Sequence, residues 1–301
     1  MRRGVPAQPS DHGVRDFRFR RLDKPEEFRA VEEVQRLAWG LQEEPPVPSP
    51  LLRAVQDNGG LVLGAFADIH LVGFTLGFLG WDGTLLFHYS HMTAVRPEYQ
   101  NHRLGFRLKA FQRDEVLRSG LPLVRWTFDP LQSKNAQLNV RLLGATPDRY
   151  FVHYYGQMGS DVNRGLESDR VRVSWEIASP RVEARLAGTI PTSAEDSTRL
   201  ARSQPAVTTT LGEVGLRVPT AVEEPSAPEV HLEVPFDIGL FQQHAPGDAR
   251  RWRHAVRDAF RAGFDLGYRV DDFAVLSIAH ERRSFYFLSR PNPSKPESPS
   301  A

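Results

Sequence analysis

A short turn of the sequence, residues 100–105, has the composition of a phosphate-binding junction between a strand and a helix. The residues before it, 85–95, are rich in β-branched and aromatic types and predict a strand. After it, Leu104, Leu108 and Phe111 recur at the spacing of a half-buried helix. Such a junction directs free backbone N–H groups and the positive end of a helix to one point, where a pyrophosphate fits.

The predicted strand carries the side chains that could move protons. It offers His88, Tyr89 and His91 but no carboxylate. An imidazole titrates near neutral pH, as a general base or water relay must. Alternation along a straight strand puts His91 on the face of Thr93, and His88 on the opposite face with Met92. The two histidines therefore cannot chelate one metal ion, and we expect no metal site. For each histidine the alternative is a structural role, hydrogen-bonded in or beside the core.

Composition places the chain among ordinary globular proteins and removes several kinds of chemistry. Of 301 residues, 40% are hydrophobic and 25% are charged, the net charge is +1 and there is no cysteine. Disulfides, thiolate zinc sites and a cysteine nucleophile are therefore excluded, and a cytoplasmic location fits. The small net charge gives no reason to expect nucleic acid as a partner. No apolar run approaches the length of about 18 residues that indicates a membrane span.

Patterning along the chain predicts an α/β protein with two folded parts. Residues 14–178 show the order strand, helix, short helix, three strands, helix, strand, helix and two strands. Composition shifts to Pro, Ser, Thr and Ala over 179–228, which predicts a linker or irregular segment. Residues 229–290 predict a smaller α/β module, and 1–13 and 291–301 a disordered leader and tail. About 60 residues make a marginal core alone, so we expect the module to pack on the first domain or on a partner chain, as in a homodimer.

The turn and its flanks resemble the acyl-CoA-binding signature of the GNAT N-acetyltransferase superfamily, Gln/Arg-x-x-Gly-x-Gly/Ala. The match is Gln100-x-x-Arg103-x-Gly105, preceded by the typical Ala94-Val95-x-Pro97-x-Tyr99. Arg103 stands where the signature has a glycine that lets the backbone approach the phosphates. An arginine there can add a charge-assisted contact to the same phosphates. The alternative is an ordinary strand-to-helix turn.

The resemblance implies the GNAT fold, a mixed α/β sheet that splays open between two neighbouring parallel strands with acyl-CoA in the wedge. It implies acetyl-CoA or succinyl-CoA as co-substrate, no metal, and a small-molecule primary amine as acceptor. The implied cofactor-binding residues come from the end of the strand, the turn, the start of the helix and a later helix: Thr93, Ala94, Val95, Gln100, Asn101, His102, Arg103, Leu104, Gly105, Phe106, Arg107, Asn135 and Asn139.

Proteins of this superfamily transfer the acyl group directly to the amine. A base takes the amine proton, and an acid can protonate the departing thiolate. The resemblance makes His88 and His91 the candidate bases. The family's usual tyrosine acid falls at Val140 here, so Tyr150 and Tyr154 are the candidate replacements. Packing on a last strand is the alternative for both tyrosines.

Further stretches, 126–139 and 154–156 among them, resemble a GNAT subgroup of acyltransferases with an extra C-terminal module. Some members are associated with N-acylamino-acid racemases and linked to N-succinylation of D-amino acids, which implies an amino-acid acceptor. The implied substrate-binding residues are Asp129, Tyr155 and Arg170. Arg170 or Arg125 would fork the acceptor carboxylate. For Arg170 the alternative is a local ion pair with the preceding Asp169.

Two functions of other classes stay open. A non-catalytic acyl-CoA-binding or regulatory protein is favoured by Val140 in place of tyrosine, by Arg103 in place of glycine and by a strand without a carboxylate. A purely structural protein would show no affinity for CoA at all.

Overall fold

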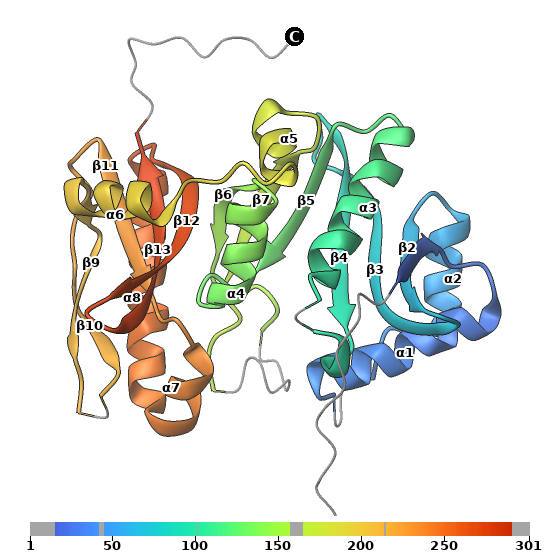
Figure 1. Cartoon of the computed structure of the whole chain (residues 1–301), viewed down its shortest axis with the longest axis horizontal. Coiled ribbons are helices and arrows are strands. Elements are labelled where there is room, and N and C mark those ends of the chain that lie inside the picture. The colour runs from blue at the N-terminus through green and yellow to red at the C-terminus, as the bar shows by residue number, and fades with distance from the viewer. Residues whose placement is uncertain (1–15, 42–44, 101, 157–164, 214, 291–301) are drawn as a thin grey trace, which may run out of the picture.

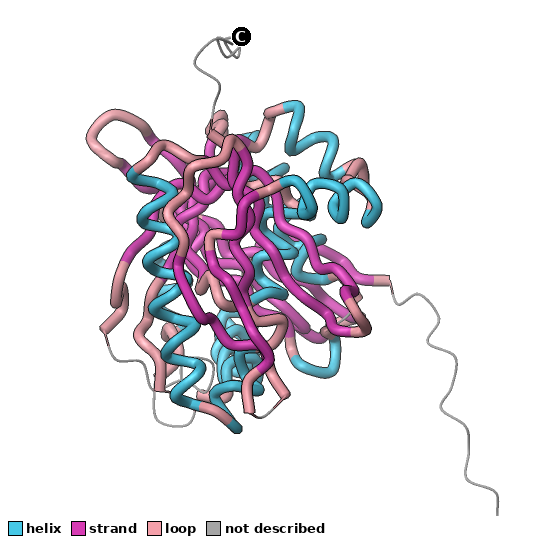
Figure 2. Tube along the Cα trace, turned by 90° about the vertical axis from the view of Figure 1, so that its left-hand side faces the viewer, coloured by secondary structure: helices cyan, strands magenta, loops and turns pink. Residues whose placement is uncertain are grey.

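The computed structural model describes residues 16–41, 45–100, 102–156, 165–213 and 215–290. Within them the chain builds two β-sheets and a two-stranded ribbon, with helices around them (Figures 1 and 2). None of the helices in these ranges is both long and apolar enough to pass through a lipid bilayer.

The first sheet has seven strands in the order β1-β2-β3-β4-β5-β7-β6. Neighbours are antiparallel except β4 and β5, which run parallel. The strands are β1 (Phe17–Arg21), β2 (Leu61–Ala67), β3 (His70–Trp81), β4 (Leu86–Val95), β5 (Leu123–Phe128), β6 (Thr146–Phe151) and β7 (Arg170–Glu176).

The sheet splays open between its two parallel strands. In the described residues β4 and β5 share two register pairs, His88 with Val124 and Tyr89 with Arg125. Beyond these pairs the strands part and leave a wedge. The predicted mixed sheet that opens between neighbouring parallel strands is therefore confirmed.

Helices cover both faces of the first sheet because each has one apolar side. Helix α1 (Pro25–Trp39) buries Phe28 and Val31 on one face, where α2 (Ser49–Asp57) joins it. Helix α3 (Leu104–Arg118) buries Leu104 and Leu108 against the other. A short turn, η1 (Pro97–Tyr99), precedes α3, and the short α4 (Ser133–Ala136) continues into the π-helical η2 (Gln137–Leu142).

The second sheet has four strands in the order β12-β13-β11-β8. A ribbon of two antiparallel strands, a short helix of 7 residues and a long helix of 20 residues accompany it. The elements after β7 are α5 (Pro180–Leu186), α6 (Ser193–Arg202), β8 (Gln204–Pro205), β9 (Val207–Leu211), β10 (Arg217–Val222), β11 (Glu229–Val234), α7 (Ile238–His244), α8 (Pro246–Asp265), β12 (Arg269–Ile278) and β13 (Glu281–Ser289).

The structure differs from the prediction of an irregular segment at 179–228. This segment holds α5, α6, β8 and the β9–β10 ribbon. The Thr192 side chain and Glu195 cap the start of α6 reciprocally, and β8 pairs in parallel with β11. The polar composition arises because much of the segment lies at the surface, where Ser and Thr cap helices and pair across strands. The second sheet therefore includes residues before 229.

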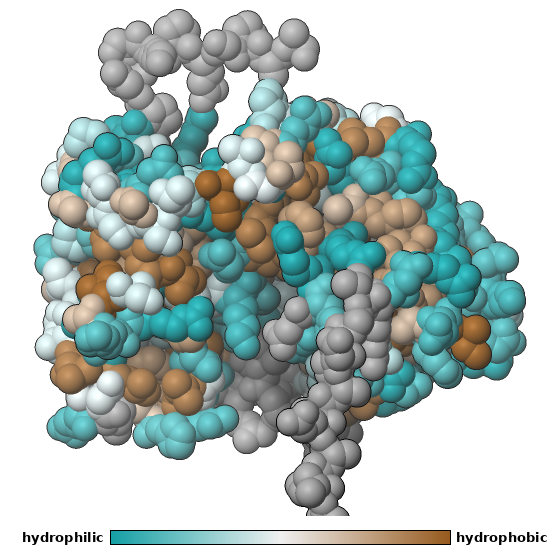
Figure 3. Space-filling view, in the orientation of Figure 1, coloured by the Kyte–Doolittle hydropathy of each residue, from teal (hydrophilic) through white to brown (hydrophobic). Residues whose placement is uncertain are grey.

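The two sheets share one hydrophobic core. A single cluster of buried side chains includes Trp126 and Trp175 of the first sheet and Phe260, Phe273 and Tyr286 of the second unit. Strand β12 packs on η2 and on β6, and α8 packs on β6. On the face shown in Figure 3, apolar patches are interrupted by polar ones. The small module thus completes its core on the first sheet, as its size requires.

Candidate active site

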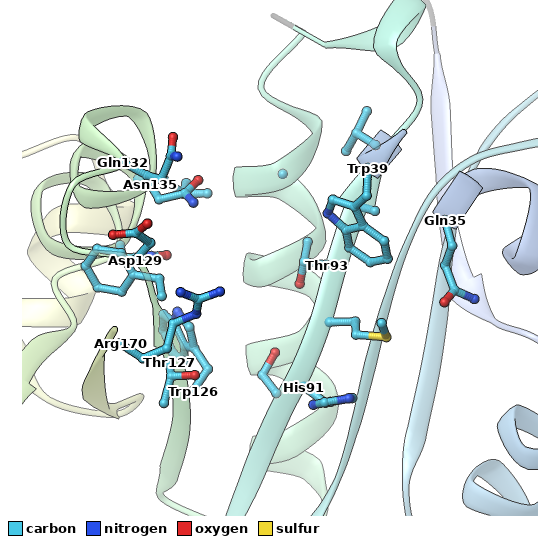
Figure 4. Close-up of a pocket in the computed structure, with 18 of the residues that line it drawn as sticks. Gln35, Trp39, His91, Thr93, Trp126, Thr127, Asp129, Gln132, Asn135 and Arg170 are labelled. Carbon is cyan, nitrogen blue, oxygen red and sulfur yellow. The ribbon is translucent and has the colours of Figure 1, made fainter. Parts of the chain in front are cut away.

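A cavity of about 490 Å³ lies where β4 and β5 separate. Its walls come from β4, β5, the end of α1, one face of α3 and the α4–η2 helix. Figure 4 shows Asp129, Gln132 and Asn135 on one wall, and His91 and Thr93 on the wall across from them. The wedge in the sheet is therefore an open site with polar groups on both sides.

A β-bulge at His91 shapes one wall of the cavity. Gly77 pairs with Ser90 and Leu76 with Met92, so His91 is the extra residue of β4 in the register with β3. The bulge reverses the alternation that follows it. Thr93 Oγ1 lies 3.0 Å from Thr75 Oγ1, in the hydrogen-bond network under α3 to which Ser90 also belongs. The prediction that His91 and Thr93 share a face of the strand is therefore wrong, because it assumed a straight strand, although both residues line the open wedge.

The two candidate bases lie in different surroundings. His91 lines the cavity, and burial lowers its pKa, so the ring is neutral at pH 7 and can accept a proton. His88 is buried outside the cavity lining, with its Nε2 3.1 Å from Gln112 Nε2. Burial, and then the charge of Lys109, lower the pKa of His88 to about 3. His88 therefore has the structural surroundings that were its alternative, and His91 is placed for chemistry.

Lys109 is a cavity residue that the sequence reasoning missed. Its Nζ donates to Ser90 Oγ at 2.8 Å and Gln112 Oε1 at 3.1 Å, and lies 3.7 Å from the centre of the Trp126 ring. Burial lowers its pKa to about 7. The available signal was its spacing, because Lys109 follows Gly105 by four residues and so shares its face of the helix.

The turn before α3 has the geometry of an anion site. Arg103 adopts a left-handed conformation with φ 55°, which favours the glycine of the signature. Arg103, the N-cap residue, makes no capping hydrogen bond through its side chain, so within the described residues it leaves the first N–H groups of α3 open. Gly105 lines the cavity, and a Cβ there would meet only the Leu138 side chain, at 3.7 Å. The residues present therefore fit a phosphate-bearing cofactor that enters the wedge.

Some of the implied cofactor-binding residues line the cavity, and others contact the turn, the core or aromatic rings instead. Thr93, Ala94, Val95, Gly105, Asn135 and Asn139 line the cavity. Gln100 donates to the Val95 carbonyl at the end of β4, and the His102 ring hydrogen-bonds to the carbonyls of Tyr99 and Gln100. Leu104 and Phe106 pack in the core. The Arg103 guanidinium lies over Phe106, and that of Arg107 over Phe17 and Phe19. Asn101 lies outside the described residues.

The implied substrate-binding residues all line the cavity, but Asp129 has a structural partner. Both of its carboxylate oxygens accept from Arg253 of α8, at 2.8 and 2.7 Å. The loop after Asp129 is held by two more contacts with the second sheet: Tyr286 donates to the Pro130 carbonyl, and Ser133 shares a hydrogen bond with Ser284. The second unit therefore fixes one wall of the cavity.

Of the two candidate arginines, Arg170 reaches the cavity. Its guanidinium lies over the Tyr155 ring and donates to the backbone carbonyl of Asp169. The carboxylate of Asp169 pairs instead with Arg257, so the local ion pair that was the alternative for Arg170 does not form between the side chains. Arg125 pairs with Asp82 outside the cavity lining.

The candidate acids lie away from the cavity. Tyr150 donates to Asp169 at 2.8 Å, and burial raises the pKa of its hydroxyl well above the usual range. Tyr154 packs against Phe151 and Tyr155. Neither tyrosine lines the cavity: the Tyr150 hydroxyl is used in the hydrogen bond to Asp169, and Tyr154 packs on its aromatic neighbours. The described residues also contain no cluster of three or more metal-ligating side chains.

Comparison with known proteins finds similarity in structure alone. No family model and no curated protein matches the sequence. The ribosomal-protein-S18-alanine N-acetyltransferase of Escherichia coli matches with a TM-score of 0.44 at 16% identity, over 55% of this chain and 96% of its own. An acetyltransferase of the GNAT family from Streptococcus pneumoniae matches with a TM-score of 0.43 at 13% identity, over 53% and 98%.

A third match is a chain of the NatC complex bound to Gag peptide and CoA, with a TM-score of 0.43, 16% identity and coverage of 54% and 98%. At these scores the likeness identifies no substrate.

Proposed function

We propose that the protein is an acyl-CoA-dependent N-acyltransferase that transfers an acyl group directly to a primary amine. The observation that carries the proposal is one continuous cavity. It joins the uncapped N-terminus of α3, where Gly105 leaves room for phosphate, to the wedge beside His91. A bound CoA thioester would supply an activated acyl group, held by the first turn of α3 and by Asn135 and Asn139.

The chain's own residues supply the acid–base and positioning chemistry. Neutral His91 projects from the bulge into the cavity and accepts the proton of the amine, directly or through water. Arg170 faces the cavity from β7 and forks the carboxylate of an amino-acid acceptor. The acyl group, acetyl or succinyl, and a D-amino-acid acceptor rest on the subgroup resemblance.

The test is thermal unfolding with CoA, acetyl-CoA and succinyl-CoA, because a ligand that binds only the folded state raises its stability by RT ln(1 + [L]/Kd). Gly105→Asp places a carboxylate where the phosphates bind. Gly247→Asp is its matched control, since Gly247 is also the second residue of a helix and a Cβ there meets nothing within 4 Å. We expect stabilisation of the wild type and of Gly247→Asp, and none of Gly105→Asp. No stabilisation of the wild type by any of the three would contradict the proposal.

A non-catalytic acyl-CoA-binding protein is the second candidate. It is favoured by the buried Val140 at the acid position and by the absence of Tyr150 and Tyr154 from the cavity lining. The two functions differ in one measurement. An enzyme releases free CoA thiol when a suitable amine is supplied, and a binding protein protects the thioester whatever the amine.

A further inference from the structure

Lys109 lies at the closed end of the wedge. Its Nζ contacts Ser90 and Trp126, the first residues of β4 and β5 beyond the pairs that join the strands. All three residues line the cavity. A group that fills the wedge to its end therefore meets this ammonium.

No carboxylate in the described part of the chain forms an ion pair with Lys109. Its two hydrogen-bond acceptors, Ser90 and Gln112, are neutral, and the residue is 3% exposed. Burial alone accounts for the lowering of its pKa to about 7. A buried cation without a counter-ion is costly, and an anion that forms in the adjoining cavity offsets that cost.

The anion that leaves in acyl transfer from a thioester is the thiolate, whatever the acyl group is. The residue that would protonate it by analogy is absent, since Val140 has no acidic hydrogen. Tyr155 also lines the cavity and could donate a proton, but it is 43% exposed and lies under Arg170, the residue proposed to bind the acceptor. Lys109 instead shares a helix face with Gly105, one turn or about 6 Å along α3.

We propose that Lys109 is the catalytic residue that stabilises and protonates the leaving thiolate. The amine nitrogen forms the new bond to the acyl carbon and the carbon–sulfur bond breaks, with its electron pair on sulfur. The Lys109 ammonium then gives one proton to sulfur, and the proton lost by the amine goes to His91. This inference rests on the proposed function, because it needs CoA in the wedge.

The test measures the thiol pKa of bound CoA from the pH dependence of its alkylation by iodoacetamide, a reaction of the thiolate. The chain has no cysteine to compete. We expect the thiol pKa in the wild type to lie at least one unit below that of free CoA. In Lys109→Met it should return to the free value, while Lys134→Met, an exposed lysine on α4, should match the wild type.

A second measurement uses the wild type alone, so the proposal can be tested even if Lys109→Met does not fold. Affinity for CoA should rise between pH 6 and pH 8 relative to that for desulfo-CoA, which has no thiol to ionise. The proposal is overturned if bound CoA keeps its free thiol pKa in the wild type, or if Lys109→Met shows the same lowered value. It is also overturned if Lys109→Met alters only the preference between succinyl-CoA and butyryl-CoA, since Lys109 would then bind the acyl group. Failure of both CoA and desulfo-CoA to bind would instead refute the proposed function.

Discussion

The two terminal nitrogens of the Arg253 guanidinium donate hydrogen bonds to the two carboxylate oxygens of Asp129, at 2.8 and 2.7 Å. Both side chains are buried. Arg253 belongs to α8 and Asp129 directly follows β5, so the pair joins the second unit to the cavity wall. It makes the wall's position depend on a residue more than a hundred positions away in sequence. This dependence can be tested through the stability of the protein.

Asp129→Asn should destabilise the protein strongly. It leaves the buried Arg253 cation without its charge partner, and breaking a buried pair in this way costs about 3–5 kcal/mol. Urea unfolding at pH 7 measures the loss. Asp57→Asn, which breaks the exposed pair with Arg53, is the control and should leave the midpoint close to that of the wild type. Equal midpoints for Asp129→Asn and the wild type would show that the pair does not hold the wall.

His91→Gln should lower kcat/KM for acyl transfer by about 10²–10⁴, the range for a lost general base. In the wild type the rate should fall as pH drops through the pKa of His91, because only the neutral ring accepts a proton. Burial lowers that pKa, so the acid limb should lie below pH 6.5, the ordinary value for histidine. The profile of kcat/KM against pH measures this limb. An unchanged acid limb in His91→Gln would assign the base elsewhere.

His88 should make stability depend on pH without affecting the chemistry. Its pKa is about 3 in the folded protein and about 6.5 in an unfolded chain, so the unfolded state binds the extra proton between these values. The contribution of neutral His88 is complete above pH 6.5 and is lost as pH falls toward 3. Between pH 6.5 and pH 5 the free energy of unfolding should therefore fall by about 2 kcal/mol.

The measurement for His88 is the free energy of unfolding at pH 6.5 and pH 5 for the wild type and His88→Gln. The variant should lose less stability over this interval than the wild type. His280→Gln, at the turn between β12 and β13, is the control and should keep the full slope. A slope in His88→Gln equal to that of the wild type would mean that other groups produce it.

Arg170→Met should raise KM for an amino-acid acceptor at least tenfold and leave KM for acyl-CoA within about twofold. A carboxylate that is hydrogen-bonded to a guanidinium loses about 1.5–3 kcal/mol with that contact. The matched substrate is the amide of the same amino acid, whose KM should change little. Steady-state kinetics with both acceptors gives the answer, and an equal loss for acid and amide would remove Arg170 from carboxylate recognition.

The sequence was sufficient where local patterns determine the structure. The strand predicted over 85–95 corresponds to β4, and the helix predicted after the turn at 100–105 corresponds to α3. Their apolar spacing and their breakers are local signals, and the splay between β4 and β5 followed from the family resemblance.

What the sequence could not supply depends on long-range contacts. The bulge at His91 is set by pairing with β3, so alternation along β4 alone put Thr93 on the wrong face. Within 179–228, residues 204–205 form a strand because β11, far along the chain, offers them a partner. Lys109 is significant only because β4 and β5 separate beside it, and a lysine at a half-buried helical position otherwise reaches solvent.

The hydrophobic core that the two sheets share limits how the two parts of the chain can evolve. A polypeptide cut after residue 228 would retain every residue that lines the cavity, yet η2 and β6 would lose the β12 and α8 surfaces that cover them. We therefore expect the wedge and the second sheet to be inherited together. We expect recombination that exchanges the C-terminal module to succeed only if the new module supplies an arginine and a tyrosine in place of Arg253 and Tyr286. These two residues hydrogen-bond to the loop at Asp129 and Pro130.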